Sequence, residues 1–431
     1  MPAIKSPQDV HYLAFQGGGG LGFAYLGAIE AFQALNVLPV VPGACGQLRG
    51  VSGTSAGAIT ALLVSLGCTY ADLESIFSSR SEFEAFFDDP WPGKCRGLEP
   101  DNLYDARVRS PGIDRESRSV IESVQEVISW IKDLVGTGPT LAAALPAIQV
   151  LGPITAMMLA LSLGRKSAIE KIGIDAPFLK RACERPFDYL SNLVNERGIY
   201  PGFAVRTFLA KSMRRLVARI PNWRLHSRAP DPAKLSFAEL KAITGIELKV
   251  CATNLSQRRS VIFSAVTTPD FPVIEAVGMS ACYPFVFKPV FINAPSHDLV
   301  LGQLRGLWLD GGILNNIPIH SFDDVSAGSV GRLNKHVLAL LLHEGAPQSI
   351  SNYRDPMRDE SPLLGLAEDM YSTLLAPGRA GQFRSPEELL QTVDLFTYEL
   401  SLLELSPTKS TAKLPLQEAR RAVLDYFNVR R

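Results

Sequence analysis

Short apolar runs of strand length alternate along most of the chain with segments of helical periodicity. The strand-like runs lie near residues 11–16, 48–52, 246–252, 260–264, 306–309 and 337–342. A helix is predicted over 236–243, where Ser236 and Glu239 have the spacing of a capping box. This alternation is typical of a layered α/β fold, with helices on both faces of a mainly parallel sheet.

The pattern changes after His343. Residues 346–362 are rich in Pro, Ser, Asp and Arg, which predicts an exposed loop. Helical signals follow at 363–375, 386–404 and 415–427. We therefore expect an α/β domain over 1–345 and a helical C-terminal extension over 346–431.

The α/β domain is interrupted by an apolar, helical insertion at about 111–194. Residues 111–135 have apolar positions at helical spacing, and 141–163 is a run of 23 residues without a charged side chain. Pro146 and the Gly152-Pro153 pair divide this run into pieces too short to cross a bilayer singly. A buried hairpin, an interfacial hairpin or lid, and a transmembrane helix all remain open.

Composition limits the classes of function. The chain has 431 residues, 46% of them hydrophobic, with 43 basic and 43 acidic side chains. A balanced charge without a basic stripe argues against a nucleic-acid partner. The six cysteines are scattered, which argues against a metal site or a disulfide framework and for a reducing compartment. No secretory signal is visible, so we expect a cytoplasmic protein, with signal-less export left open.

The segment Gly53-Thr54-Ser55-Ala56-Gly57 stands between a strand-like run and an apolar helical run. Glycines two residues before and after Ser55 allow the sharp strand-to-helix turn of a nucleophile elbow. The turn would place the Ser55 hydroxyl at a helix N-terminus, where free amides stabilise negative charge. The alternative is an ordinary tight turn.

A glycine-rich loop follows the first predicted strand and precedes a helix, with the sequence Gly17-Gly18-Gly19-Gly20-Leu21-Gly22. Its amides could bind the pyrophosphate of a dinucleotide, because Gly17, Gly19 and Gly22 fit G-x-G-x-x-G. They could instead form an oxyanion hole. A dinucleotide site needs a carboxylate about 20 positions on. Residues 34–42 contain none, which favours the oxyanion hole.

A third element is Asp310-Gly311-Gly312, at the end of the strand-like run 306–309. None of the six histidines lies in a recognisable triad context. An aspartate that touches the serine directly could act as the base. Taken alone, an aspartate followed by glycines is more often a turn residue.

Together these elements resemble the patatin-like phospholipase family, whose motifs are G-G-G-x-[RK]-G, G-x-S-x-G and D-G-[GA]. Further segments similar to the family are 196–202, 236–248, 251–255, 272–277 and 280–285. The resemblance covers about 10–110 and 195–345. It implies a three-layer α/β/α fold that carries a Ser–Asp dyad.

The resemblance also implies the roles of single residues. Ser55 would be the nucleophile and Asp310 its base, with the amides of Gly18, Gly19 and Ala56 as the oxyanion hole. The supporting motif glycines would be Gly17, Gly20, Gly22, Gly53, Gly57, Gly311 and Gly312. The family's usual basic residue in the glycine loop is Leu21 here, which puts the head-group preference in doubt.

The expected activity is hydrolysis of fatty-acyl esters of membrane lipids, as in a phospholipase A or lysophospholipase, without a metal or cofactor. A lipid transacylase or a triacylglycerol lipase could use the same dyad. A non-catalytic nucleotide-binding protein is the alternative from another class. The expected partner is a membrane lipid, with peripheral membrane contact through 141–163. A protein regulator is unknown.

Overall fold

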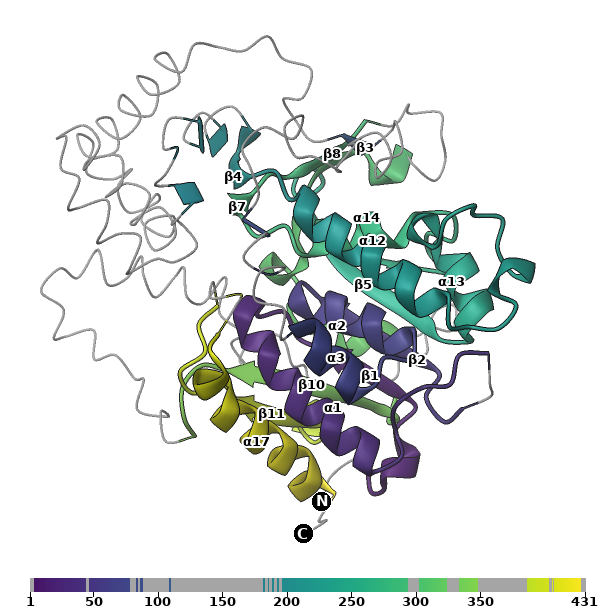
Figure 1. Cartoon of the computed structure of the whole chain (residues 1–431), viewed down its shortest axis with the longest axis vertical. Coiled ribbons are helices and arrows are strands. Elements are labelled where there is room, and N and C mark those ends of the chain that lie inside the picture. The colour runs from purple at the N-terminus through teal and green to yellow at the C-terminus, as the bar shows by residue number, and fades with distance from the viewer. Residues whose placement is uncertain are drawn as a thin grey trace, which may run out of the picture.

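The computed structural model describes seven stretches of the chain (Figure 1). They are residues 4–43, 46–77, 196–293, 302–323, 333–347, 386–402 and 407–427, with isolated positions at 83, 86, 87, 108, 109, 181, 182, 185, 188, 189, 192, 193 and 405. The predictions for 111–135, 141–163 and 363–375 lie outside the described residues.

A sheet in the order β11-β10-β1-β2-β5-β9-β8-β3 forms the centre of the molecule, with β6 also paired to β5. Its parallel strands are β1 (Tyr12–Phe15), β2 (Gly50–Thr54), β5 (Glu247–Asn254), β10 (Val337–His343) and β11 (Thr392–Phe396). The antiparallel strands are β3 (Val108–Arg109), β6 (Arg259–Ser264), β8 (Val290–Ile292) and β9 (Gly306–Asp310). A separate parallel pair consists of β4 (Gly198–Tyr200) and β7 (Phe285–Phe287). All six strand predictions are confirmed.

The α-helices are α1 (Tyr25–Ala34), α2 (Ala56–Ser65), α3 (Tyr70–Phe77), α12 (Phe203–Val217), α13 (Phe237–Thr244), α14 (Val273–Ser280), α16 (Pro386–Leu389) and α17 (Lys409–Tyr426). The 3₁₀ helices are η1 (Pro7–Asp9), η2 (Gly19–Ala24), η5 (Trp223–Leu225), η6 (Pro232–Lys234), η7 (Gly302–Leu304), η8 (Gly311–Ile313) and η9 (Ile319–Phe322). The capping box predicted for α13 is present, with both hydrogen bonds between Ser236 and Glu239.

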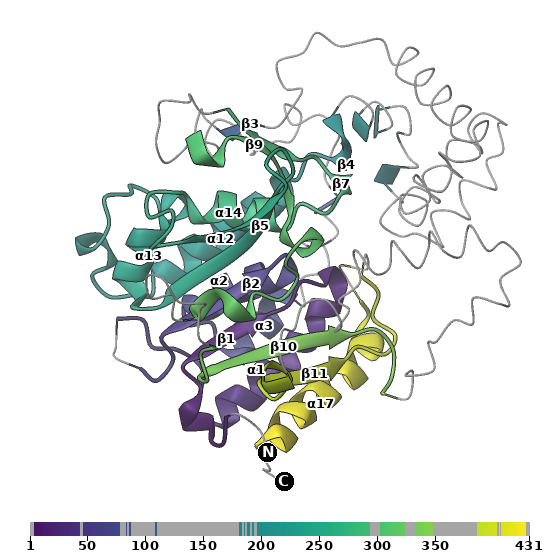
Figure 2. The same cartoon turned by 180° about the vertical axis from the view of Figure 1, so that it is seen from behind.

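Alternate residues of the central strands face opposite sides of the sheet. On β1, Leu13 and Phe15 join the main core with α1 and α2, whereas Ala14 packs against Ile319 and Phe322 of η9. The predicted α/β class with a mainly parallel sheet is confirmed. Figure 2 shows the strands from the side opposite α1 and α17.

The prediction of a helix over 386–404 is wrong. Helix α16 ends at Leu389, and the next element is the strand β11, which pairs parallel to β10 from Ala339↔Thr392 to His343↔Phe396. Thr-Val-Asp-Leu-Phe has the two-residue alternation of a strand, and pairing with the edge of β10 outweighs its helical signal.

The C-terminal residues are part of the same α/β unit. Helix α17 begins at Lys409, capped by the Thr408 hydroxyl, and packs along α1. The approach is close, because a Cβ on Gly27 would overlap the carbonyl oxygen of Leu416. The described part of 346–431 therefore extends the sheet and one helical layer.

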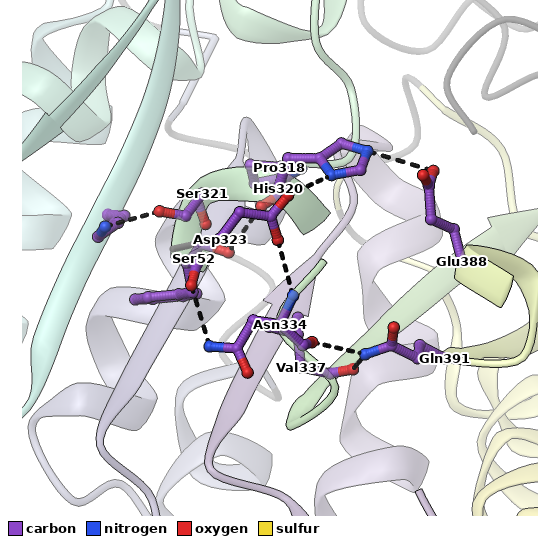
Figure 3. Close-up of polar contacts among 11 residues, drawn as sticks. Ser52, Pro318, His320, Ser321, Asp323, Asn334, Val337, Glu388 and Gln391 are labelled. Atoms are coloured by element: carbon purple, nitrogen blue, oxygen red, sulfur yellow. Dashed lines mark hydrogen bonds and ion pairs between the residues drawn. The ribbon is translucent and has the colours of Figure 1, made fainter. Parts of the chain in front are cut away.

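A cluster of polar side chains connects η9 and residues 334–337 with residues 388–391 near the C-terminus (Figure 3). The ring of His320 lies between two carboxylates, with Nδ1 2.8 Å from Asp323 and Nε2 3.2 Å from Glu388. Gln391 donates from Nε2 to the carbonyl oxygens of Asn334 and Val337, both at 2.8 Å. These contacts hold the segment that follows the Asp310 loop.

Candidate active site

Ser55 occupies the turn between β2 and α2. Its backbone has φ 53° and ψ −124°, a positive φ that a non-glycine residue rarely adopts. The turn is tight, because a Cβ on Gly57 would overlap the carbonyl oxygen of Phe15. The predicted strand–turn–helix arrangement around Ser55 is therefore present.

Asp310 lies one strand away from Ser55. Thr54 pairs with Cys251 on one side of β5, and Asp310 pairs with Ala252 on the other. Strand β9 runs antiparallel and ends with Asp310 at the level where β2 ends. This register brings residues that are far apart in the sequence to one point of the sheet.

The Asp310 side chain is only 4% exposed, and its Oδ1 accepts a hydrogen bond of 2.7 Å from the Gly312 amide. Burial raises the pKa of Asp310 to about 7, while hydrogen bonding from the Ser55 hydroxyl and the Gly312 amide acts in the opposite direction. In the described part of the chain, Oδ2 makes no hydrogen bond of ordinary geometry. The contact between the Ser55 hydroxyl and Asp310 therefore departs from ordinary hydrogen-bond distance or alignment.

The glycine loop is held at both ends. The Gly17 amide donates to the carbonyl oxygen of Asn316 at 3.0 Å, and Asn316 Nδ2 donates back to the carbonyl oxygen of Gly17 at 3.3 Å. The Gly20 amide donates to the carbonyl oxygen of Leu402 at 2.8 Å. Gly19 between them has φ 49°, and a Cβ there would overlap that same oxygen.

Three amides near Ser55 remain available for an anion. Outside the regular helices and strands, no hydrogen bond among the described residues is donated by the amides of Gly18, Gly19 or Ala56. Gly18 and Gly19 line one pocket together with Ser55 and Asp310. Ala56 is the first residue of α2, where backbone amides lack partners in the helix. These are the amides proposed from the sequence for the oxyanion hole.

The remaining motif residues support the loop geometry. Gly22 lies against Ala56, since a Cβ there would stand 3.2 Å from the Ala56 Cβ. A Cβ on Gly53 would overlap the backbone of Gly57, and one on Gly311 would overlap the carbonyl oxygen of Cys251. Leu21 is fully buried in the main core, so this position faces away from the solvent.

An apolar pocket of about 780 Å³, including its open mouth, adjoins the polar pocket. Ser55, Gly19, Tyr283 and Leu402 line both. The apolar pocket is rich in phenylalanine, with contributions from Phe23, Phe77, Phe83, Phe86, Phe87 and Phe287. Ser55 thus stands where a polar site meets an apolar one.

Sequence reasoning assigned no role to three residues that contact this site. Ser280 accepts a hydrogen bond from the Ser55 amide, Asn316 holds Gly17, and Leu402 holds Gly20. Asn316 could have been noticed, because it follows the aspartate motif closely. The partners of Ser280 and Leu402 are distant in the sequence and leave no local signal.

The described residues include neither a cluster of metal ligands nor a membrane-spanning helix. No three His, Cys, Asp or Glu side chains in these stretches lie together as metal ligands would. No helix within the same stretches combines the length and the apolar character needed to cross a bilayer.

Comparison with known proteins supports the family resemblance of the glycine-loop, serine and aspartate motifs. The family model described as patatin-like phospholipase matches residues 13–323. An uncharacterized protein, R571, of Acanthamoeba polyphaga mimivirus is 38% identical over 84 residues, which is 20% of this chain and 25% of that protein. The probable lipid hydrolase 463L of Invertebrate iridescent virus 6 is 32% identical over 85 residues, or 20% and 26% of the two chains. The aligned part thus spans about a quarter of these curated relatives.

Solved structures give weaker likenesses. VipD from Legionella pneumophila has 17% identity and a TM-score of 0.42, covering 97% of this chain and 67% of VipD. The heterodimeric ExoU–SpcU complex from the type III secretion system of Pseudomonas aeruginosa has 16% identity and a TM-score of 0.38. This match covers 98% of this chain and 52% of the chain in that structure. At these TM-scores the likenesses support no conclusion about this chain.

Proposed function

The chain belongs to the patatin-like phospholipase family, and from this premise we propose that it is a lipid acyl hydrolase acting through Ser55 and Asp310. The observation that carries the proposal is the position of Ser55. It lies between a polar pocket, with Asp310 and unpaired amides, and an apolar pocket whose phenylalanine-rich lining suits an acyl chain.

The polar pocket would perform the chemistry. Asp310 accepts the hydroxyl proton of Ser55 while Ser55 Oγ attacks the ester carbonyl carbon. The amides of Gly18, Gly19 and Ala56 bind the oxyanion of the tetrahedral intermediate. The proton passes from Asp310 to the leaving alcohol, and the acyl group stays on Ser55 Oγ.

Hydrolysis of this acyl-enzyme uses the same groups. Asp310, again ionised, takes a proton from a water molecule that attacks the acyl carbon, and Ser55 leaves with that proton as the fatty acid departs. A base with a pKa of about 7 suits both steps, because about half of such groups are ionised at neutral pH and the protonated form still gives the proton back.

The apolar pocket would select the substrate. Each methylene transferred from water into such a pocket contributes about 0.8 kcal/mol, so a long acyl chain binds far better than a short one. Ile59 lies one turn of α2 beyond Ser55 and lines this pocket. It is therefore a position from which the space for the chain can be altered without touching the dyad.

The test compares butyryl and palmitoyl esters of one chromogenic alcohol. Ile59→Trp should lower kcat/KM for the palmitoyl ester roughly tenfold or more, because a few lost methylene contacts at 0.8 kcal/mol each amount to that factor. The butyryl ester should be affected much less. The matched control is Val266→Trp, a change at a 72% exposed position away from both pockets. Equal losses for both esters would contradict the acyl pocket.

The role of Ser55 needs a separate readout. Wild-type protein should react covalently with a fluorophosphonate probe, which requires an activated nucleophile, and Ser55→Ala should not. A wild-type protein that hydrolyses neither ester and resists the probe would refute the proposed function.

A further inference from the structure

Residues 280–282, at the end of α14, contact the backbones of both Ser55 and Asp310. The Ser55 amide donates to Ser280 Oγ at 2.8 Å, and the Asp310 amide donates to the carbonyl oxygen of Cys282 at 3.0 Å. One short segment therefore connects the two residues of the dyad, which come from different strands.

The direction of the hydrogen bonds at Ser280 is fixed. Its hydroxyl donates to the carbonyl oxygen of Cys251 on β5 at 2.6 Å. A hydroxyl has one proton to donate, so the oxygen must present a lone pair to the Ser55 amide. Ser280 is fully buried, so water does not compete for these contacts.

The backbone of Ser55 needs such a support. A non-glycine residue at φ 53° is in a strained conformation, which persists only where the surrounding structure determines it. The bond from Ser280 restrains this amide directly. It also occupies the amide, so the anion site must be built from its neighbours in the elbow and the glycine loop.

Helix α14 is itself held firmly. Glu275 on α14 is fully buried and forms an ion pair of 3.0 Å with Arg206 on α12, whose side chain is 4% exposed. A Cβ on Gly278 would collide with the same guanidinium, so the two helices are closely packed. The hydroxyl of Ser280 thus extends from a fixed element.

We propose that Ser280 is a positioning residue for the reaction, whose hydroxyl holds the Ser55 amide so that Ser55 Oγ faces Asp310. This inference rests on the proposed function of Ser55 and Asp310. Ser280 does not touch the reacting atoms, so its effect should appear in the rate of chemistry and not in acyl-chain binding.

The experiment measures inactivation by a fluorophosphonate probe and hydrolysis of the butyryl ester in Ser280→Ala. Misplacement of a reacting group by about 1 Å can cost roughly 10²-fold in rate, so kcat and the maximal inactivation rate should fall by about that factor. KM and the probe's half-saturation concentration should stay within about threefold of the wild-type values, because both pockets are intact.

Two further variants separate positioning from stability. Ser65→Ala removes another fully buried hydroxyl, this one on α2, the helix that follows Ser55; it donates to the carbonyl oxygen of Leu62 at 2.7 Å and lines neither pocket. It should lower the melting temperature comparably and leave kcat near the wild-type value. Ser280→Cys keeps a weaker donor and acceptor at the same position, so it should restore part of the rate.

The outcomes are distinct. If folded Ser280→Ala reacts within threefold of wild type, or if Ser65→Ala loses as much kcat, the inference is wrong while the proposed function stands. If Ser280→Ala does not fold, Ser280→Cys decides: a maximal inactivation rate several-fold lower supports the inference, and an unchanged rate overturns it. If the wild-type protein itself is not labelled at Ser55, the proposed function fails and the inference fails with it.

Discussion

The Gly312 amide donates a hydrogen bond of 2.7 Å to Oδ1 of Asp310. This contact fixes one oxygen of a carboxyl group that is almost completely buried, and it leaves Oδ2 without a hydrogen bond of ordinary geometry in the described part of the chain. Burial is the largest influence on the group and raises its pKa to about 7.

Ester hydrolysis should require ionised Asp310. We expect kcat/KM for a neutral ester to fall about tenfold per pH unit below about pH 7 and to reach a plateau above it, because only the ionised carboxylate accepts the Ser55 proton. The measurement is a pH–rate profile with a soluble ester. A rate that is constant from about pH 5 to pH 8 would exclude Asp310 as the base with this pKa.

Folding stability should also depend on Asp310, but here the protonated form is the favourable one, whereas hydrolysis needs the ionised form. The pKa of Asp310 is about 7 in the folded protein against the ordinary value of 3.8, so the folded state binds this proton more tightly than the unfolded state does. Its contribution to stability is complete below about pH 4 and is lost as the pH rises to about 7. An asparagine at position 310 does not titrate, so the Asp310→Asn variant should not lose stability in this way as the pH rises.

Asp310→Asn should therefore gain stability relative to the wild type as the pH rises. With about 1.4 kcal/mol per pKa unit, the difference in free energy of unfolding should change by roughly 4 kcal/mol between about pH 4 and pH 7, and then stay constant. Urea unfolding at several pH values measures it. A difference that does not vary with pH would show that the Asp310 carboxyl is not held in its neutral form by burial.

The two residues of the dyad should act as a unit. Ser55→Ala and Asp310→Asn should each lower kcat by about 10³-fold or more, and the double variant should be about as inactive as either one, since losses within a catalytic unit do not add. Steady-state hydrolysis and melting curves of the three variants provide the measurement. Near-normal turnover in Asp310→Asn would mean that another group is the base.

The glycine loop should be sensitive to a single methyl group. Gly19→Ala should lower kcat by about 10²-fold, as loss of an oxyanion donor does, because its Cβ would overlap the Leu402 carbonyl oxygen and its φ is positive. Gly46→Ala is the control, since a Cβ there meets nothing within 4 Å. The alternative function of the glycine loop, nucleotide binding, is tested by calorimetry of the wild-type protein with NAD, FAD and ATP. Tight binding of any of the three would favour a nucleotide site over an oxyanion hole.

Much of the candidate site could be predicted because its serine and aspartate motifs lie at the ends of strands. Ser55 directly follows β2 and Asp310 is the last residue of β9, and residues at strand ends meet at the edge of a layered sheet. The glycines carry a local signal too, since a sharp turn or a close backbone approach needs them. The six predicted strands were found for the same reason, as period and composition are local properties.

The parts that were missed depend on contacts across the chain. β11 has apolar residues that fit a helix as well as a strand, and only the open edge of β10 decides between them. Ser280 is 225 positions from Ser55, so the role of its hydroxyl cannot be read from its neighbours. Leu402 contributes a backbone carbonyl, which every residue has, and therefore leaves no trace in the sequence.

The bond between Gly20 and Leu402 has a consequence for biosynthesis. The glycine loop leaves the ribosome early, whereas the carbonyl group that holds it follows 382 residues later. At about 5–20 residues per second, translation of that interval takes roughly 20 to 80 seconds. Strand β1 likewise lacks its sheet neighbour β10 until that strand, far later in the chain, has been translated. A nascent chain thus contains Ser55 long before it can complete the anion site, and hydrolytic activity should begin only after the segment that contains Leu402 has left the ribosome.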